Sequence, residues 1–356
     1  MASDAAARFS PDQLEVPIVQ APLAGGPSTP ELAAAVANAG GLGFLAAGYR
    51  TPETVRQELA ELRRQTERPV GLNLFVPSRA SVDRDAVDRY ARQLAAEAER
   101  YDARLGEPRE DDDGWDAKLA LAAEERPDVV SFAFGCPAPA VVEDLRRAGV
   151  AVWITVTTPA EARVARDAGA DALIAQGVEA GGHRASFDDL EPGDLGLLAL
   201  LQLVGAEVDL PLVASGGIVS GRGVAGALAA GAAAVQLGTA FMLTREAATS
   251  PAHREALRKR GTRTALTRAF TGRTARGLVN RFMREHQDAP SAYPQVHHLT
   301  AGIRAAARES GDADGINLWA GQAYALGDEG DAGELVRRLA EEAREALGDA
   351  GRRLPG

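Results

Sequence analysis

The sequence is poor in cysteine, in excess positive charge and in long apolar segments. Cys136 is the only cysteine among 356 residues, so the chain can form neither an internal disulfide nor a cysteine-rich metal site. This cysteine usage is compatible with a reducing cytoplasm, which is the location we expect. Residues 1–17 include Asp4, Arg8, Asp12 and Glu15 and contain no apolar core, so they are not expected to act as a signal peptide.

Positive charge is outweighed by negative charge. The 50 acidic and 39 basic residues give a formal net charge of -11. Nucleic acids and anionic membranes attract proteins with an excess of lysine and arginine, so we expect neither as a main partner. A local basic site for a small anion is still compatible with this balance.

One uncharged stretch, residues 223–244, is long enough for a membrane span, which needs about 20 apolar residues. It consists mainly of alanine and glycine and is interrupted by Gly226, Gly231, Gln236 and Gly238. This composition is typical of a short buried helix followed by a buried strand. A membrane is therefore not expected as a partner.

Short apolar runs alternate regularly with longer amphipathic stretches. The runs are residues 16–20, 42–46, 70–75, 129–133, 150–155, 172–175, 212–215 and 234–237. Eight strands interleaved with helices predict an α/β protein with a closed parallel (β/α)8 TIM barrel. Between the third and fourth strands, residues 81–126 are expected to form two solvated helices separated by a loop around 107–114.

After Phe241 this rhythm breaks into a charged, arginine-rich segment that is expected to be helical to about residue 312. A last amphipathic helix at residues 335–347 is expected to pack back on the barrel. We therefore assign residues 1–242 and 315–356 to the barrel. Residues 243–314 are assigned to a smaller helical insert that would form a substrate lid.

Glycine-rich turns follow the last two predicted strands, where barrels commonly bind phosphate. Ser215, Gly216 and Gly217 follow the seventh strand, and Gly238 and Thr239 follow the eighth. Their backbone N–H groups can face an anion without obstruction by side chains, although glycine also serves ordinary turns. The positive end of the helix that begins near Gly221 and Gly223 is expected to contribute. There is no P-loop or full dinucleotide fingerprint, so a nucleoside triphosphate is not indicated.

Other predicted strand ends carry groups that can meet one flat ligand. Residues 21–26 follow the first strand, Asn73 lies in the third, and Gln176 follows the sixth. Backbone at 21–24 and the two amides could match the hydrogen-bonding edge of an isoalloxazine ring. For Asn73, a strand-end hydrogen bond to backbone is an equal alternative.

His183 is the histidine best placed for catalysis, because it ends a glycine-rich loop beyond the sixth strand. Imidazole can move a proton near neutral pH or donate a hydrogen bond to an anion. A purely structural role is the alternative. The other histidines lie in the predicted insert, have no zinc-like spacing, and are expected to have surface or hinge roles without a metal: His253, His286, His297 and His298. Cys136 follows the fourth strand and is read as a small buried residue rather than a nucleophile.

These motifs together resemble the class I nitronate monooxygenases, formerly called 2-nitropropane dioxygenases, which are FMN-dependent barrels. The resemblance rests on residues 20–26, 71–75, 176–183, 214–218 and 236–241, and farther on 271–280 and 317–322. It implies that His183 is the active-site histidine. It also implies that FMN is contacted by Ala21, Pro22, Leu23, Asn73, Gln176, Gly181, Gly182, Ser215, Gly216, Gly217, Gln236, Leu237, Gly238 and Thr239. Leu23 stands where relatives often have methionine, which should preserve the backbone contact.

The resemblance implies that an alkyl nitronate, such as propionate 3-nitronate, is oxidised by O2 to a carbonyl compound and nitrite, a detoxification. His183 would hold the negative nitro group, and would act as a base only toward neutral nitroalkanes. An FMN-dependent enoyl-acyl-carrier-protein reductase that uses NAD(P)H is the alternative enzyme. A cofactor-free barrel isomerase and a non-catalytic binding protein also stay open. A homodimer is one option, since many barrels dimerise. Tyr293, Trp319 and Tyr324 are candidates for an apolar substrate wall or for ordinary core packing.

Overall fold

The computed structural model describes residues 8–78 and 81–353 and contains the predicted parallel barrel. Its strands are β1 (Ile18–Gln20), β2 (Gly43–Ala46), β3 (Val70–Phe75), β4 (Val129–Ala133), β5 (Ala151–Val156), β6 (Ala172–Gln176), β8 (Leu212–Ser215) and β9 (Ala234–Leu237). They pair in parallel in the order β1-β9-β8-β6-β5-β4-β3-β2. Between β1 and β2, Gln20 N donates to Leu42 O at 2.9 Å and Leu42 N to Ile18 O at 3.0 Å. These bonds close the sheet, so the predicted (β/α)8 barrel is confirmed.

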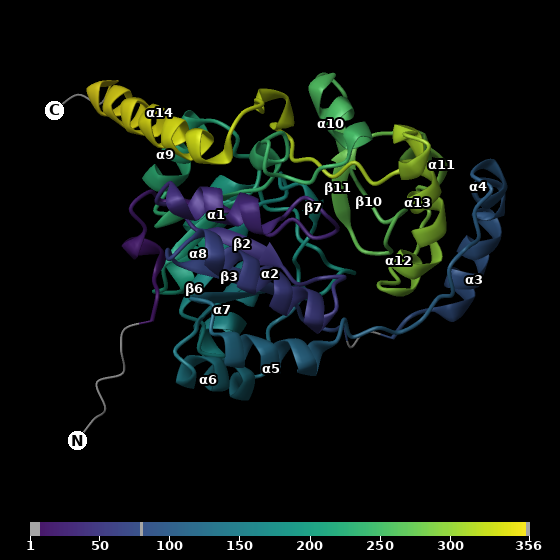
Figure 1. Cartoon of the computed structure of the whole chain (residues 1–356), viewed down its shortest axis with the longest axis horizontal. Coiled ribbons are helices and arrows are strands. Elements are labelled where there is room, and N and C mark those ends of the chain that lie inside the picture. Colours follow the sequence, from purple (N-terminus) through teal and green to yellow (C-terminus); the bar gives the residue numbers. More distant parts are fainter. Residues whose placement is uncertain (1–7, 79–80, 354–356) are drawn as a thin grey trace.

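Helices cover the outside of the barrel (Figure 1). They are α1 (Pro30–Asn38), α2 (Pro52–Gln65), α5 (Trp115–Glu125), α6 (Pro139–Arg147), α7 (Pro159–Asp167), α8 (Leu197–Glu207) and α9 (Gly221–Ala229). The last helix, α14 (Ala332–Arg353), packs against α9 and α1. The predicted final helix is therefore confirmed and is longer at both ends than the sequence pattern indicates.

Threonine caps fix where several of these helices begin. The side chains of Thr29, Thr51 and Thr158 each accept a hydrogen bond from the backbone N–H three residues on, and a proline follows each of them. A threonine cap satisfies one of the free N–H groups of the first turn, and proline at the first helical position has a suitable φ. Each Thr-Pro pair thus starts a helix at a defined residue.

The barrel interior changes from apolar to polar along the strands. Phe44, Trp153 and Ile174 belong to the fully buried cluster inside the barrel. Because side chains alternate along a strand, Thr155 lies on the same face of β5 as Trp153 but nearer its carboxyl end. The core thus fills the body of the barrel, and polar side chains remain at the carboxyl ends of the strands.

The segment after the barrel is not entirely helical, and that prediction is wrong. It contains α10 (Pro251–Arg258), α11 (Arg281–Glu285), α12 (Gln295–Leu299) and α13 (Ala301–Glu309), but also β10 (Thr264–Thr267) and β11 (Ala275–Leu278). β11 pairs antiparallel with β10 and with β7 (Gly182–His183), which lies in the loop after β6. These strands are short, and β7 lies far from β11 in sequence, so no local alternation of apolar residues marks them.

The region 81–126 also differs from the expectation of two solvated helices. It forms α3 (Arg84–Gln93), α4 (Ala95–Arg100) and α5, with a loop at residues 101–114. α3 and α4 share an apolar cluster with the insert, in which Tyr90 and Leu94 pack near Phe270 and Phe282. The Tyr90 hydroxyl donates to Ala269 O at 2.7 Å. Figure 1 shows these helices beside α11–α13 at the right.

The uncharged stretch 223–244 divides between α9, β9 and the short 3-10 turn Thr239–Phe241, as expected for buried barrel elements. Among the described residues, none of the helices combines the length and the apolar composition that a bilayer crossing requires.

Candidate active site

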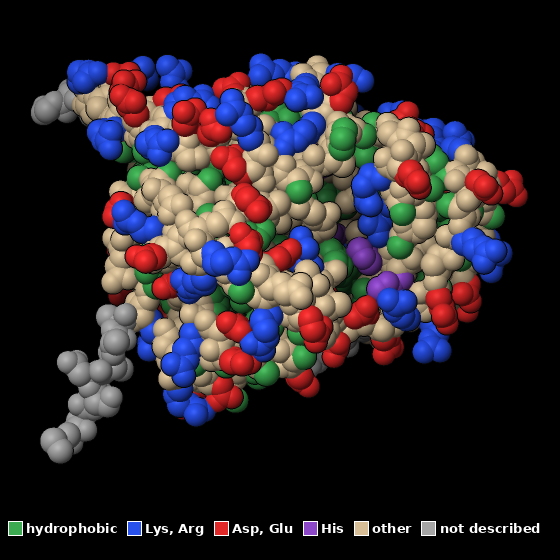
Figure 2. Space-filling view, viewed as in Figure 1, with side chains coloured by type: hydrophobic (Ala, Val, Ile, Leu, Met, Phe, Trp, Pro, Cys, Tyr) green, Lys and Arg blue, Asp and Glu red, His purple; other side chains and the backbone are tan. Residues whose placement is uncertain are grey.

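A cavity of about 340 Å³ lies at the carboxyl ends of the barrel strands, where the barrel loops meet the insert. Figure 2 shows histidine side chains within a hollow at this boundary. The sequence-predicted site residues that line the cavity are Ala21, Pro22, Leu23, Asn73, Gln176, Gly181, Gly182, His183, Ser215, Gly216, Gly217, Gln236, Gly238 and Thr239. Barrel geometry thus brings residues from distant strand ends around one space, and their roles toward a cofactor stay predictions.

Leu237 is the one predicted site residue that does not line the cavity. Its side chain is buried in the barrel core. Its carbonyl oxygen accepts a hydrogen bond from Ala21 N at 2.8 Å. The backbone of Leu237 therefore supports the loop after β1, because β9 and β1 are neighbours. Its side chain does not line the cavity, because side chains alternate along β9 and that of Gln236 faces the cavity.

The glycine loops have no room for a side chain where they pack on neighbouring loops, and they form a bare backbone cradle beside the cavity. Gly217 has a φ of 69°, and a Cβ there would lie 2.9 Å from the Cβ of Glu179. At Gly181 a Cβ would lie 2.5 Å from Gly321 N. That same Gly321 N donates to the Thr239 hydroxyl at 3.0 Å, which joins the chain that follows the insert to the loop after β9. Such turns leave room for a ligand to approach the backbone.

The start of α9 does not contribute to this cradle as expected. Gly221 N donates to the Glu342 carboxylate at 3.0 Å, and Gly223 N donates to the Ser220 hydroxyl at 3.3 Å. Neither glycine lines the cavity. The expectation is wrong because α14 brings Glu342 to the N-terminus of α9. The local sequence does not predict where α14 packs.

The three sequence-predicted amides of the cavity differ in the hydrogen-bonding groups that they have free. Asn73 donates to Ser131 O at 3.2 Å and to its hydroxyl at 3.0 Å, so it does make the strand-end hydrogen bond. Gln176 donates to His183 O at 3.1 Å and accepts from Ala185 N at 3.0 Å. Within the described residues, Gln236 Oε1 is buried without a hydrogen-bond partner. Gln236 therefore offers a buried acceptor that no described protein group uses.

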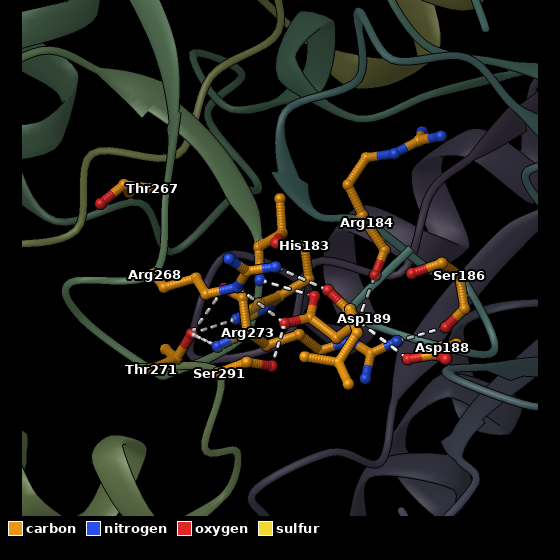
Figure 3. A network of polar contacts seen from close by, with 12 residues as sticks. His183, Arg184, Ser186, Asp188, Asp189, Thr267, Arg268, Thr271, Arg273 and Ser291 are labelled. Carbon is orange, nitrogen blue, oxygen red and sulfur yellow. Dashed lines mark hydrogen bonds and ion pairs between the residues drawn. The ribbon is translucent and has the colours of Figure 1, made fainter. Parts of the chain in front are cut away.

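His183 lies on β7 with its ring against the cavity. Its Nε2 is 2.9 Å from the Thr271 hydroxyl, and Figure 3 shows the two side chains meeting. Aromatic rings surround the imidazole, with Trp319 at 5.5 Å, Phe134 at 5.7 Å and Tyr293 at 6.1 Å between centroids. Burial lowers the pKa of His183 to about 3, and the charge of Arg273 adds to the effect. The imidazole is therefore neutral at physiological pH.

A polar network behind His183 joins the loop after β7 to the insert (Figure 3). Arg273 lies with its guanidinium 4.2 Å from the centre of the Phe134 ring and donates to the backbone oxygens of Arg184 and Ser186. Asp189 gives the network its negative charge. The Asp189 carboxylate accepts from three groups of the insert: Arg268 Nε at 3.0 Å, Thr274 N at 2.9 Å and the Ser291 hydroxyl at 2.8 Å.

The expectation of surface or hinge roles for the insert histidines is wrong for three of them, since His286 is buried in the insert. His253 is buried, and its Nε2 lies 3.0 Å from Trp319 O. His297 lines the cavity and stacks on Tyr49, with 4.3 Å between ring centroids and 4° between planes. Sequence reasoning also missed Tyr49, Phe134, Thr271 and Arg304, which line the cavity as well.

The remaining sequence candidates divide between cavity and core. Trp319 lines the cavity. Tyr293 borders a neighbouring cavity, and Tyr324 is a core residue whose hydroxyl donates to Thr262 O at 2.8 Å. Cys136 is half-buried outside the cavity, and burial raises the pKa of its thiol to about 11. The thiol is therefore protonated near neutral pH and makes a poor nucleophile.

One group of acidic and histidine side chains in residues 8–78 and 81–353 has metal-like spacing: Glu97, Glu285 and His286. The guanidinium of Arg281 already pairs with both carboxylates. None of these residues lines the cavity. We therefore read the group as an ion-pair cluster of the insert.

Known proteins resemble the chain over nearly its whole length. A family model described as nitronate monooxygenase matches residues 11–342. A nitronate monooxygenase from Pseudomonas aeruginosa is 44% identical over 351 residues, which cover 93% of this chain and 97% of the relative. A solved structure of nitroalkane oxidase from Streptomyces ansochromogenes is 53% identical, with a TM-score of 0.93 and coverage of 96% and 99% of the two chains. The structure of FabK from Thermotoga maritima is 30% identical, with a TM-score of 0.76 and coverage of 97% and 98%. The chain therefore belongs to the nitronate monooxygenase family and is an oxidoreductase enzyme.

Proposed function

We propose that this enzyme uses FMN and O2 to oxidise alkyl nitronates, such as propionate 3-nitronate, to a carbonyl compound and nitrite. The observation that carries the proposal is the charge of the cavity. None of the described residues that line it is an aspartate or glutamate, whereas Arg304 and Arg308 line it and His183 is neutral. Such a site favours an anion that is already deprotonated over a neutral substrate that must lose a proton.

The residues present fit FMN. The positive-φ turn at Gly216 and Gly217 leaves a cradle for a phosphate at the strand ends where barrels commonly bind one. The unpartnered Gln236 Oε1 offers an acceptor to an N–H donor, and an isoalloxazine ring carries one. A cavity of about 340 Å³ also lies within the usual size range of cofactor sites. Gln236 would thus hold the ring and the glycine turns the phosphate.

FMN, when bound, would supply the redox chemistry by accepting an electron from the nitronate and passing it to oxygen. The chain's own residues bind and orient the substrate. Nε2 of His183 is engaged by Thr271, and Nδ1 has no hydrogen-bond partner among the described residues. Nδ1 is therefore the ring atom available to substrate. In the tautomer with its hydrogen on Nδ1 it can donate to the nitro group, and in the other tautomer its lone pair can take a proton from a neutral nitroalkane. The rings of Phe134 and Trp319 exclude water around it.

An absorption spectrum of the purified protein tests the proposal first. We expect a flavin spectrum that bleaches on anaerobic addition of propionate 3-nitronate and not on addition of NADPH. Bleaching with NADPH alone would favour the alternative enoyl-acyl-carrier-protein reductase. A protein that takes up no FMN even after reconstitution would defeat the proposal and favour a cofactor-free isomerase or a binding protein.

Three further parts of the proposal concern the setting of the enzyme. We place it in the cytoplasm, assign it a role in detoxification, and expect a homodimer. Light scattering of the FMN-loaded protein measures its mass in solution. Growth of a deletion strain on propionate 3-nitronate tests the detoxification role, since loss of the enzyme should increase sensitivity.

A further inference from the structure

Arg304 is a buried cation for which the described protein supplies no anion. Its residue exposure is 7%, and it lines the cavity from α13. Its Nε donates to the Thr300 hydroxyl at 3.0 Å and its Nη2 to His297 O at 2.7 Å, whereas Nη1 has no hydrogen-bond partner among residues 8–78 and 81–353. Over the same residues, no carboxylate oxygen lies within ion-pair distance of Arg304.

No described carboxylate balances the positive charge of Arg304. Burial, followed by the nearby charge of Arg308, lowers the pKa of Arg304 to about 10. At that value the guanidinium is still charged at neutral pH. A buried cation without a partner is unfavourable, so the fold retains an unpaired positive charge that faces the cavity.

The guanidinium is held in place by a rigid wall. Nη2 of Arg304 lies 3.4 Å from Nδ1 of His297, and burial, followed by the charge of Arg304, lowers the pKa of His297 to about 2. The neutral His297 ring stacks flat on Tyr49. Tyr49 has a φ of 67°, which non-glycine residues rarely adopt, and its N–H donates to the Asp113 carboxylate at 2.9 Å. Asp113 pairs in turn with the buried Lys118 at 2.7 Å.

Strain at a cavity wall persists only where the surrounding structure enforces it. Here the buried Lys118–Asp113 pair enforces the position of Tyr49, and the Tyr49–His297 stack fixes the side of the cavity from which Arg304 projects. A guanidinium fixed in this way loses little conformational entropy when its free Nη1 binds an anion.

We propose that Arg304 is a specificity-determining residue that binds a second negative group of the substrate, a carboxylate carried on the alkyl chain of the nitronate. The inference rests on the proposed function. The cavity then has two polar anchors, Nδ1 of His183 for the nitro group and Nη1 of Arg304 for the carboxylate. A substrate with both groups satisfies both anchors, whereas a simple alkyl nitronate leaves Arg304 unpaired.

The test compares two substrates of similar length on the FMN-loaded enzyme. Propionate 3-nitronate carries the carboxylate, and 1-butyl nitronate does not. In Arg304→Met we expect kcat/KM to fall about 100-fold for propionate 3-nitronate, as for loss of one partner of a buried charge pair, and less than about threefold for 1-butyl nitronate. Arg304→Lys should recover part of the activity on the acid, because it keeps the charge but not the guanidinium that Thr300 and His297 hold in place.

Binding without turnover gives an independent measurement. Succinate has a carboxylate where propionate 3-nitronate has its nitronate, so it should inhibit the enzyme competitively, and its inhibition constant should rise in Arg304→Met in parallel with the loss of kcat/KM. Arg284→Met is the matched control, since Arg284 is an exposed arginine of the insert outside the cavity. It should leave both substrates and succinate unaffected.

Each outcome separates this proposal from the proposed function. Equal losses on both substrates in Arg304→Met would overturn the assignment, because Arg304 would then act on the nitro group or on the fold. No loss on either substrate would also overturn it. A wild-type enzyme that oxidises neither nitronate would instead defeat the proposed function itself.

Discussion

His183 and Thr271 meet across the junction between barrel and insert, with 2.9 Å between the imidazole Nε2 and the threonine hydroxyl. Main-chain pairing supports the contact, since His183 on β7 lies opposite Ala275 on β11. The same hydroxyl lies 3.3 Å from Arg273 O, to which it can donate. If it does so, it accepts the Nε2 hydrogen and Nδ1 carries the free lone pair that could take a proton. If it donates to Nε2 instead, Nδ1 carries the ring hydrogen that could hold the nitro group.

Thr271→Val tests whether this hydroxyl positions His183. We expect kcat/KM for propionate 3-nitronate to fall about tenfold, because the ring loses the partner that fixes its tautomer and orientation. Thr271→Ser keeps the hydroxyl and should restore most of the activity. Equal activity of the Val and Ser variants would show that the methyl group, and so packing alone, determines the effect.

His183→Asn separates holding an anion from taking a proton. General base catalysis contributes about 100-fold or more, so we expect at least that loss with neutral 1-nitropropane, measured as oxygen consumption. With the preformed nitronate the loss should be about tenfold, since only a hydrogen bond of the order of 1.4 kcal/mol is removed. Losses of the same size on the two forms would contradict the division of roles.

Buried neutral histidines make stability depend on pH. Burial lowers the pKa of His253 to about 4, below its unfolded value of about 6.5. The contribution of its neutral ring to the free energy of unfolding is complete above about pH 6.5 and is lost as pH falls from there toward about 4. Between pH 7 and pH 5 this amounts to a loss of the order of 2 kcal/mol.

His253→Gln should remove that part of the pH dependence, because glutamine keeps a side-chain N–H for Trp319 O without titrating. Urea unfolding at pH 7 and pH 5 measures the difference, and an unchanged urea slope serves as the control for two-state behaviour. If the variant and the wild type lose the same stability over this range, His253 does not titrate as described.

Gly217→Ala should weaken FMN binding. Alanine is strained at a φ of 69°, and its Cβ would lie too close to Glu179. The flavin absorbance per mole of purified protein should fall, and added FMN should raise its thermal midpoint less than that of the wild type. Gly226→Ala is the control, since a Cβ there meets no atom within 4 Å and lies inside α9. It should keep full flavin content and gain about 0.5–1 kcal/mol of stability.

Asp189→Asn should loosen the insert without changing the cavity lining. The substitution keeps the shape of the side chain but removes the charge that binds Arg268, Thr274 N and Ser291. We expect a loss of about 2 kcal/mol in unfolding free energy, the usual worth of hydrogen bonds to a charged group. Asp188→Asn, at an exposed neighbouring residue, should change stability by less than about 0.5 kcal/mol. Equal effects of the two substitutions would contradict the role of Asp189.

Much of the barrel could be predicted because its signals are local. Each strand is an apolar run followed by a polar or glycine-rich strand end, and parallel strands bring all such ends to one face. This is why Asn73, Gln176, Gly217 and Thr239, from separate parts of the sequence, could be expected around one cavity. Leu237 was included with them because a motif names consecutive residues, whereas alternate side chains of a strand face opposite ways.

The insert side of the cavity could not be predicted in this way. His297 and Arg304 lie on short helices whose apolar pattern shows that one face is buried. The pattern does not show whether a given residue on that face contacts the barrel or helices α3 and α4. β7 has two residues and no pattern of its own. Its partner β11 is identified only once the insert has folded back over the barrel loops, and the strain at Tyr49 depends on Asp113, which lies far away in the sequence.

The β7–β11 pairing ties His183 to the insert as well as to the barrel. Its backbone is tied to β11 on one side, while its carbonyl oxygen accepts from Gln176 of the barrel on the other. The insert cannot swing away without tearing the small sheet or pulling His183 off Gln176. An open conformation would therefore lose the alignment of His183. A chimaera that takes its insert from a relative would inherit the alignment of the histidine together with the roof of the cavity.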